Sequence, residues 1–207
     1  MFNVGDKIVY PMHGAGVIET IEERAILDEK QSYYIIKMPG EVKVMVPTAK
    51  AEEIGVRNII DKERAGKVIN VLEQDSTEMS MKWNKRYRDN VEKMKSGDIF
   101  EVADIVRNLS FKQKEKGLST GEKKMLNNAK QILVSELVLA EHASQEEVEE
   151  IVETKINTSF NLFKTEYTLL WGHPGQRIGG LAGTGTGFLI STSSFNTAFL
   201  SIFALYS

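Results

Sequence analysis

Eight consecutive residues, MKWNKRYR at positions 81–88, place two aromatic rings among four cations. Cationic side chains neutralise phosphates and release counterions, and a flat ring can stack on a base or wedge into a base step. The segment therefore favours contact with nucleic acid. The spacing of Trp83 and Tyr87 is also typical of two core residues of an amphipathic helix whose cations face solvent, since aromatic residues at helical spacing usually pack inward. Trp83 lies at the start of the expected helix, where one side often lacks neighbours, so its ring could project.

A second basic group lies further along the chain. It comprises Lys112, Lys114 and Lys116, and the helix expected next carries Lys123 and Lys124. Unpaired N–H groups and the helix dipole make a helix N-terminus favourable for phosphate. Taken alone, this group is typical of a solvated charged loop. Its occurrence in the same domain as residues 81–88 is what favours DNA binding.

The formal net charge of -3 conceals a separation of charge along the chain. Residues 80–131 contain 13 lysines or arginines and 7 aspartates or glutamates, whereas residues 141–157 contain 1 and 6 respectively. A basic middle with acidic neighbours can meet a polyanion on one face only.

Residues suited to catalysis or metal binding do not gather in this sequence. It has no cysteine, which excludes disulfides, thiolate zinc sites and a cysteine nucleophile. His13, His142 and His173 are too scattered to suggest a metal site. The glycine-rich runs at 13–16 and 183–187 lack the lysine, strand or helix context of a phosphate-binding loop. We therefore expect no enzyme, no cofactor, no metal and no small-molecule substrate.

The elements that position these residues fall into two classes. Residues 6–53 contain β-branched and aromatic runs separated by glycine, proline and charged breaks, which predicts a small β-barrel or curled sheet. After Val56 the apolar residues repeat with a helical period over about a hundred residues. The expected helices cover 61–72, 83–95, 98–109 and 119–140, with a short last helix from Ser144, and form an all-α bundle. Ser119 and Glu122 give the strongest start signal, because they have capping-box spacing.

The end of the chain differs in composition. Residues 178–207 carry no charge and are rich in serine, threonine, glycine and phenylalanine. A membrane anchor needs about 20 predominantly apolar residues, and polar residues between 191 and 197 interrupt this run. We expect residues 158–207 to lie outside the bundle as a poorly ordered or non-native extension. Asp6 and Lys7 interrupt the apolar stretch that a signal peptide requires, so we expect a cytoplasmic protein without membrane contact.

Several short motifs are spread along the chain, and as a set they are specific for one protein family. In the first half they are GDKIVYP at 5–11 with His13, Gly14 and Gly16, then Val46-Pro47 and Gly55-Val56-Arg57. In the second half they are Trp83 with Arg86 and Tyr87, then GLS at 117–119 and GEK at 121–123. With these motifs, residues 1–157 resemble the CarD/CdnL family of bacterial transcription regulators. Residues 158–207 have no counterpart in that family.

The resemblance implies an α+β protein of two domains. Residues 1–56 would form a Tudor-like small β-barrel that interacts with RNA polymerase, and residues 57–157 a helical DNA-binding domain. The first domain would dock on the β subunit of RNA polymerase. The contacts expected there are Arg24, Lys43, Met45 and Pro47. Because Met45 stands where some relatives have arginine, this contact is expected to be more apolar.

The resemblance also implies a mechanism at promoter DNA. Trp83 would wedge into the minor groove at the upstream edge of the melted region. The phosphate contacts expected beside it, largely independent of base sequence, are Lys82, Lys85, Arg86, Arg88, Lys112, Lys114, Lys123 and Lys124. Binding energy available only from a distorted duplex would shift the promoter from closed to open, with a monomer stabilising the open complex.

A second hypothesis belongs to another class of protein. The two halves could form an adaptor that holds two proteins together and never contacts DNA. Salt dependence separates the two hypotheses, because phosphate contacts give steeply salt-dependent DNA binding and an adaptor has no DNA affinity.

Overall fold

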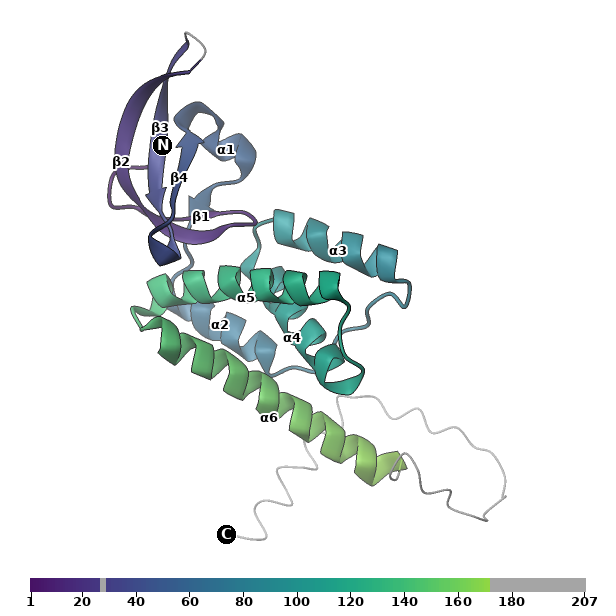
Figure 1. Cartoon of the computed structure of the whole chain (residues 1–207). Coiled ribbons are helices and arrows are strands. Elements are labelled where there is room, and N and C mark those ends of the chain that lie inside the picture. Colours follow the sequence, from purple (N-terminus) through teal and green to yellow (C-terminus); the bar gives the residue numbers. More distant parts are fainter. Residues whose placement is uncertain (27–28, 172–207) are drawn as a thin grey trace, which may run out of the picture. The chain divides into compact units, whose positions relative to one another are not determined.

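The structure is a computed structural model, and it describes residues 1–26 and 29–171. The strands of this part are β1 (Lys7–Tyr10), β2 (Gly14–Ile26), β3 (Glu29–Lys37), β4 (Lys43–Pro47) and β5 (Arg57–Asn58). Between β3 and β5 lie the 3-10 turns η1 (Pro39–Glu41) and η2 (Thr48–Lys50) and the short helix α1 (Ala51–Ile54). The helices that follow are α2 (Lys62–Leu72), α3 (Trp83–Lys95), α4 (Ile99–Glu115), α5 (Thr120–Glu141) and α6 (Gln145–Trp171), as Figure 1 shows.

The strands form one antiparallel sheet in the order β4-β3-β2-β1-β5. Within residues 1–26 and 29–171 no pairing joins the edge strands β4 and β5, so the sheet is open. The α+β arrangement of a sheet followed by helices agrees with the prediction. The closed Tudor-like barrel is not confirmed, because the two edges of the sheet do not meet.

The sheet has a small apolar core of its own. Its buried members are Ile8, Ile18, Tyr34, Ile36, Met38, Val46, Ala51 and Val56. Gly16 of β2 is required for this packing, because a β-carbon there would lie 2.5 Å from the carbonyl oxygen of Lys37. Strand β5 extends the sheet past the predicted boundary at residue 56, since Arg57 pairs with Val9 of β1.

The helices begin at the residues that the sequence signals predicted. Asp61 and Asp98 are the N-caps of α2 and α4, and each carboxylate accepts a hydrogen bond from an N–H group of the first turn. Ser119 and Glu122 form both halves of the capping box at the start of α5. The apolar faces of α2, α4, α5 and α6 build one core, in which Leu133 is fully buried. Local start signals therefore set the helix boundaries, and burial of the apolar faces holds the helices together.

Helix α3 buries a face that hydrophobic periodicity does not predict. Its buried side chains are Arg86, Asn90 and Met94, at four-residue steps. Trp83 and Tyr87 lie beside this row and remain partly exposed. Two polar side chains thus occupy positions where an amphipathic pattern places apolar ones.

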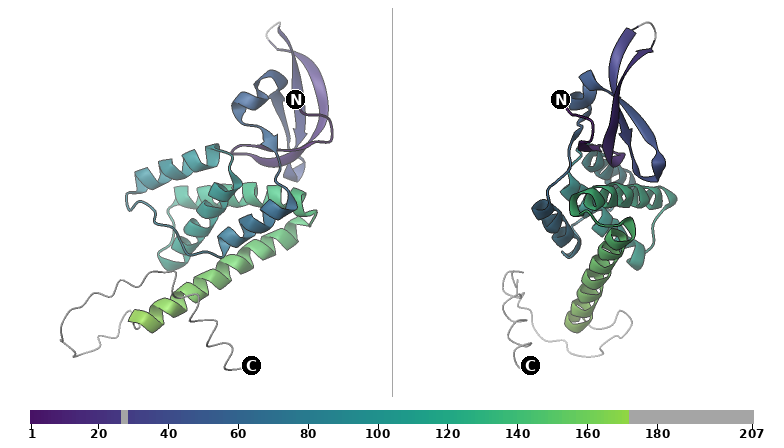
Figure 2. Two further views of the ribbon diagram at one scale, coloured as in Figure 1. Left: turned by 180° about the vertical axis from the view of Figure 1, so that it is seen from behind. Right: turned by 90° about the vertical axis from the view of Figure 1, so that its left-hand side faces the viewer.

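Helix α6 is longer than predicted. It begins after Ser144 as expected but runs to Trp171, beside α2 (Figure 2). The Ser159 hydroxyl donates to the carbonyl oxygen of Glu73, just after α2, at 3.0 Å. Phe160 packs edge-on against Phe111 of α4, with ring centroids 5.3 Å apart. The prediction that the bundle ends at residue 157 was therefore wrong for this part of the helix. The prediction for the uncharged residues 178–207 lies outside the described residues.

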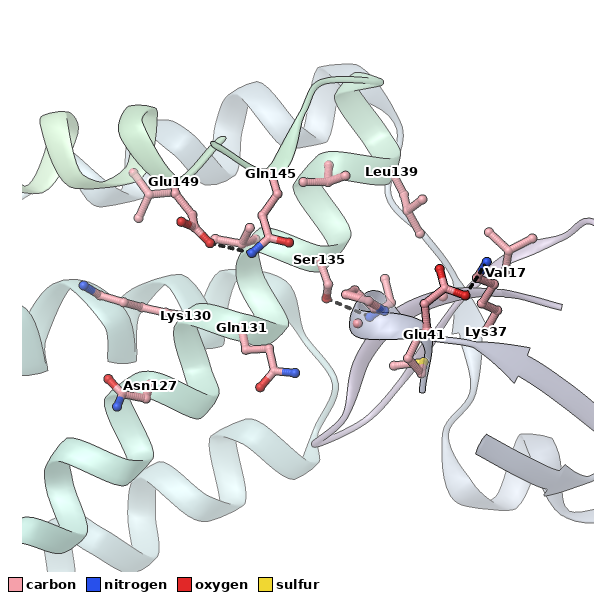
Figure 3. A pocket seen from close by; sticks show the side chains of 18 of the residues that line it. Val17, Lys37, Glu41, Asn127, Lys130, Gln131, Ser135, Leu139, Gln145 and Glu149 are labelled. Atoms are coloured by element: carbon pink, nitrogen blue, oxygen red, sulfur yellow. Dashed lines mark hydrogen bonds and ion pairs between the residues drawn. The ribbon is translucent and has the colours of Figure 1, made fainter. Parts of the chain in front are cut away.

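The sheet and the bundle are joined by polar contacts to α5. Arg57 donates two hydrogen bonds to the fully buried carboxylate of Glu136, at 2.6 and 2.9 Å. The backbone N–H of Ala15 donates to the Ser135 hydroxyl at 2.8 Å (Figure 3). Gly14 is needed beside this contact, because it has a φ of 98° and a β-carbon would fall 2.5 Å from Ser135 Oγ. Gly14 and Arg57 therefore serve the junction.

A cavity of about 630 Å³ lies beside this junction. Its walls come from the start of β2, the end of β3 and the facing sides of α5 and α6 (Figure 3). Lys37 pairs with Glu41 on its sheet side, and Gln145 donates to Glu149 on its helical side. The sheet thus packs against α5 over part of that helix only.

Candidate nucleic-acid interface

Trp83 and Tyr87 form a partly exposed pair of rings at the start of α3. Trp83 follows the N-cap residue Lys82, and the exposed fractions of Trp83 and Tyr87 are 44% and 37%. Their ring centroids lie 5.4 Å apart and their planes differ by 25°, so the rings are stacked. Met81, just before the helix, is also exposed. The alternative that both rings belong to the core is therefore excluded. The side chains of Met81, Trp83 and Tyr87 form an apolar patch at the surface.

The first turn of α5 holds the indole in place. Trp83 Nε1 donates to the hydroxyl of Ser119 at 3.1 Å. Gly121 lies against both rings, since a β-carbon there would be 3.5 Å from Cζ2 of Trp83 and 3.8 Å from Cε2 of Tyr87. Figure 1 shows the first turns of α3 and α5 at the same end of the bundle. The ring is thus fixed by a stack, a hydrogen bond and a close helix contact.

A buried carboxylate lies next to this support. Glu122 Oε1 accepts from Arg86 Nη2 at 2.7 Å and from Lys112 Nζ at 2.5 Å. Glu122 Oε2 accepts from the N–H and the hydroxyl of Ser119, at 3.1 and 2.9 Å. Burial by itself would raise the pKa of Glu122, but the hydrogen bonds from Lys112, Arg86 and Ser119 outweigh it and lower the pKa to about 2. The group is therefore a permanent anion at neutral pH.

Arg86 does not lie on the surface where the phosphate-contact prediction requires it. It is 8% exposed, and Nη1 donates to the carbonyl oxygen of Ser80 at 2.6 Å in addition to the pair with Glu122. Lys112 is engaged by the same carboxylate. A buried guanidinium whose charge is paired offers no free charge to a phosphate, and loss of its partner would leave an uncompensated buried charge. The prediction that Arg86 contacts phosphate was therefore wrong, and its role in the bundle is structural.

The other predicted cations lie on the surface. Those without a carboxylate partner in residues 1–26 and 29–171 are Lys82, Lys85, Arg88, Lys123 and Lys124. Lys114 is exposed too, but it donates to the Asn157 side chain and lies 5.5 Å from the ring centroid of Phe160. Positive charge that is not neutralised therefore lies on the first two turns of the two helices that carry and support Trp83.

The residues predicted to contact polymerase lie together on one face of the sheet. Lys43, Met45 and Pro47 alternate along β4 and so share a face. Arg24 of β2 lies on the same face. It pairs with Gln31 of β3, two residues from Tyr33, which pairs with Pro47. Met45 is 45% exposed. We call this surface the outer sheet face.

The cations of the outer sheet face have carboxylate partners. Arg24 lies 2.7 Å from Glu22, and Lys43 lies 2.5 Å from Glu19. The hydrogen bonds from Arg24, and then from Thr20, lower the pKa of Glu22 below its ordinary value. Two neutralised pairs therefore accompany the exposed methionine, and little free charge remains.

The support for the indole was not predicted from the sequence. Ser119 and Glu122 were interpreted only as a helix start, and 36 residues separate Trp83 from Ser119. Helix spacing shows contacts within one helix and not between two. The available signal was that both groups belong to the motifs that carry the family resemblance.

Residues 1–26 and 29–171 contain no group of three or more His, Cys, Asp or Glu side chains that could hold a metal ion. Among the helices of residues 1–26 and 29–171, none combines the length and the hydropathy that a membrane span requires.

Known proteins match both halves of the chain. Residues 2–60 match the family described as the CarD-like/TRCF RID domain, and residues 67–153 match the family described as CarD, C-terminal domain. The chain is 41% identical over 149 residues to a protein of Bacillus subtilis (strain 168) that is described as a proposed transcription factor, YdeB. The alignment covers 72% of this chain and 97% of that protein. The outer sheet face lies in the first family match, and Trp83 with its support lies in the second.

Proposed function

This chain belongs to the CarD family of transcription regulators, and we propose that it binds RNA polymerase and promoter DNA together. The outer sheet face binds the β subunit of the polymerase. The surface around Trp83 binds promoter DNA at the upstream edge of the melted region and stabilises the open complex. The protein acts as a cytoplasmic monomer and makes or breaks no bond.

One observation carries the DNA half of this proposal. A stacked pair of rings is partly exposed on a helix start whose neighbouring lysines and arginine have no carboxylate partner in the described residues. Unstacking a base step costs a few kcal/mol, and a ring that fills the opened step returns part of that energy. Because intact duplex offers no such gap, the ring favours DNA that is already distorted.

The helix that supports Trp83 also contacts the sheet, which supports joint action. Ser119 contacts the indole and Ser135 contacts Ala15 of β2, both from α5. At 1.5 Å per residue, these two serines lie about 24 Å apart along the helix. A single helix thus links the two proposed binding surfaces, so the polymerase contact sets where the indole reaches the DNA.

The test of DNA binding is a salt titration with two DNA fragments of the same sequence, one fully paired and one forked at the upstream edge of the melted region. We expect tighter binding to the forked fragment and affinity that falls steeply with salt. Lys85→Gln removes one unpaired cation and should reduce the slope of log K against log salt by about 0.9. Lys95→Gln is the control, because Lys95 lies on the same helix but is paired with Glu92.

Equal binding of both fragments, or a slope that Lys85→Gln leaves unchanged, would contradict the proposal. Absence of measurable DNA affinity with retained polymerase binding would favour the adaptor instead.

A further inference from the structure

We infer that Ser119 is a positioning residue, which holds the Trp83 indole in its DNA-binding orientation before DNA arrives. Ser119 need not contact DNA for this role. The inference rests on the proposed function, because it assigns a task to the support of the same ring. It also gives Ser119 and Glu122 a functional role in addition to capping helix α5.

The hydrogen bonds around Ser119 leave its hydroxyl one orientation. A serine hydroxyl has one proton and two acceptor lone pairs. The proton goes to Glu122 Oε2 at 2.9 Å, and the oxygen accepts from Trp83 Nε1 at 3.1 Å and from the Glu122 N–H at 3.3 Å. The donor and both acceptor sites are therefore in use, and the indole N–H has a fixed partner.

Glu122 maintains this orientation because it stays ionised. A carboxylate accepts only, so it must take the Ser119 proton and cannot compete for the lone pairs that Trp83 needs. Arg86 and Lys112 supply the positive charge that keeps Glu122 an anion in a buried place. Arg86, which was expected to bind phosphate, therefore helps to hold the Trp83 ring in place through Glu122 and Ser119.

Fixing the ring in advance matters for affinity. Trp83 is 44% exposed at the first residue of a helix, so core packing on all sides does not restrict its rotamers. Ordering one such side chain during binding costs about 0.5 to 1.5 kcal/mol, which is about two- to tenfold in affinity. A ring that is already ordered avoids this loss.

The test compares Ser119→Ala and Ser119→Thr in a Trp171→Phe background, where Trp83 is the remaining tryptophan of the two in the sequence. Time-resolved fluorescence anisotropy of the full chain reports local motion of the indole, and titration with forked DNA reports affinity. We expect Ser119→Ala to increase indole motion and to weaken forked-DNA binding about two- to tenfold. Ser119→Thr keeps the hydroxyl and should behave as the parent.

Ser144→Ala controls for the loss of a helix cap. Ser144 and Glu147 form the same reciprocal pair of hydrogen bonds at the start of α6, where no ring contact accompanies it in the described residues. Both alanine variants should lose stability, because each removes an N-cap serine. Only Ser119→Ala should change the anisotropy and the DNA affinity.

Two results would overturn the inference. One is indole motion in Ser119→Ala equal to the parent. The other is increased motion without a change in affinity, while Trp83→Ala in the same assay weakens binding. If Trp83→Ala also leaves binding unchanged, the proposed function itself fails, so the two failures are distinguishable.

Discussion

The two proposed binding surfaces of this protein hold their charge in opposite ways. At the Trp83 end, ion pairs lie inside the bundle, as between Arg86 and Glu122, and the surface cations there have no carboxylate partner in the described residues. On the outer sheet face the ion pairs lie on the surface itself, where Lys43 and Glu19 are 55% and 39% exposed. The first surface therefore shows positive charge, and the second shows an exposed methionine between neutralised pairs.

This difference predicts two kinds of partner. Unpaired cations beside aromatic rings suit a polyanion with accessible base steps, and such binding weakens steeply with salt. A methionine with paired charges suits a protein surface, where apolar contact gives affinity and the rim charges give orientation.

The largest expected effect is on folding stability. Glu122→Ala removes the buried partner of Arg86 and Lys112 and leaves Arg86 buried without its anion. We expect the free energy of unfolding to fall by about 3 to 5 kcal/mol, measured by urea denaturation. Glu19→Ala is the control, because it breaks an exposed pair and should change stability by about 1 kcal/mol or less. Equal losses in the two variants would remove the contrast between buried and surface pairs.

The next effect concerns the outer sheet face. Arg24→Glu places a carboxylate beside Glu22 where a neutral pair now lies, and we expect about five- to tenfold weaker binding to the isolated β lobe of the polymerase. Lys30→Glu is the matched control, because Lys30 lies one residue along β3 from the partner of Arg24 and so faces the other way. Equal affinities of Arg24→Glu and the parent would move the interface elsewhere.

The smallest effect is the acid dependence of stability. The folded pKa of Glu122 is about 2, below its ordinary value of 4.5, so its ionised form stabilises the fold. That contribution is complete above about pH 5 and is lost as the pH falls from 4.5 toward 2, with a loss of ~1 kcal/mol near pH 4. Denaturation at a series of pH values should therefore give a flatter curve for Glu122→Gln than for the parent. Parallel curves would show that Glu122 is not held ionised.

Much of the fold could be predicted because its signals are local. Asp61, Asp98 and Ser119 act as caps through hydrogen bonds within one helical turn, and the sequence places each cap next to an apolar stripe. The exposed cations Lys85 and Arg88 and the faces of β4 follow from the same short-range logic. These features can be predicted without knowing which helices and strands are in contact.

The rest depends on contacts between distant segments, which one sequence does not show. Arg86 was expected on the surface because it is charged, yet Glu122, 36 residues away, makes its burial favourable. The end of the bundle was placed too early because Ser159 of α6 bonds the backbone just after α2 and Phe160 packs against α4. Closure of the sheet into a barrel likewise depends on an edge pairing that strand patterns do not reveal.

The most direct measurement of the central claim is the lifetime of the open promoter complex with the parent and with Trp83→Ala, at equal occupancy of the polymerase. We expect the variant to fold and bind polymerase as the parent does, because Trp83 is 44% exposed. We also expect it to shorten the lifetime about tenfold, since base–aromatic stacking is worth roughly 1 to 3 kcal/mol. An unchanged lifetime with normal folding would contradict the claim that the indole stabilises the melted promoter.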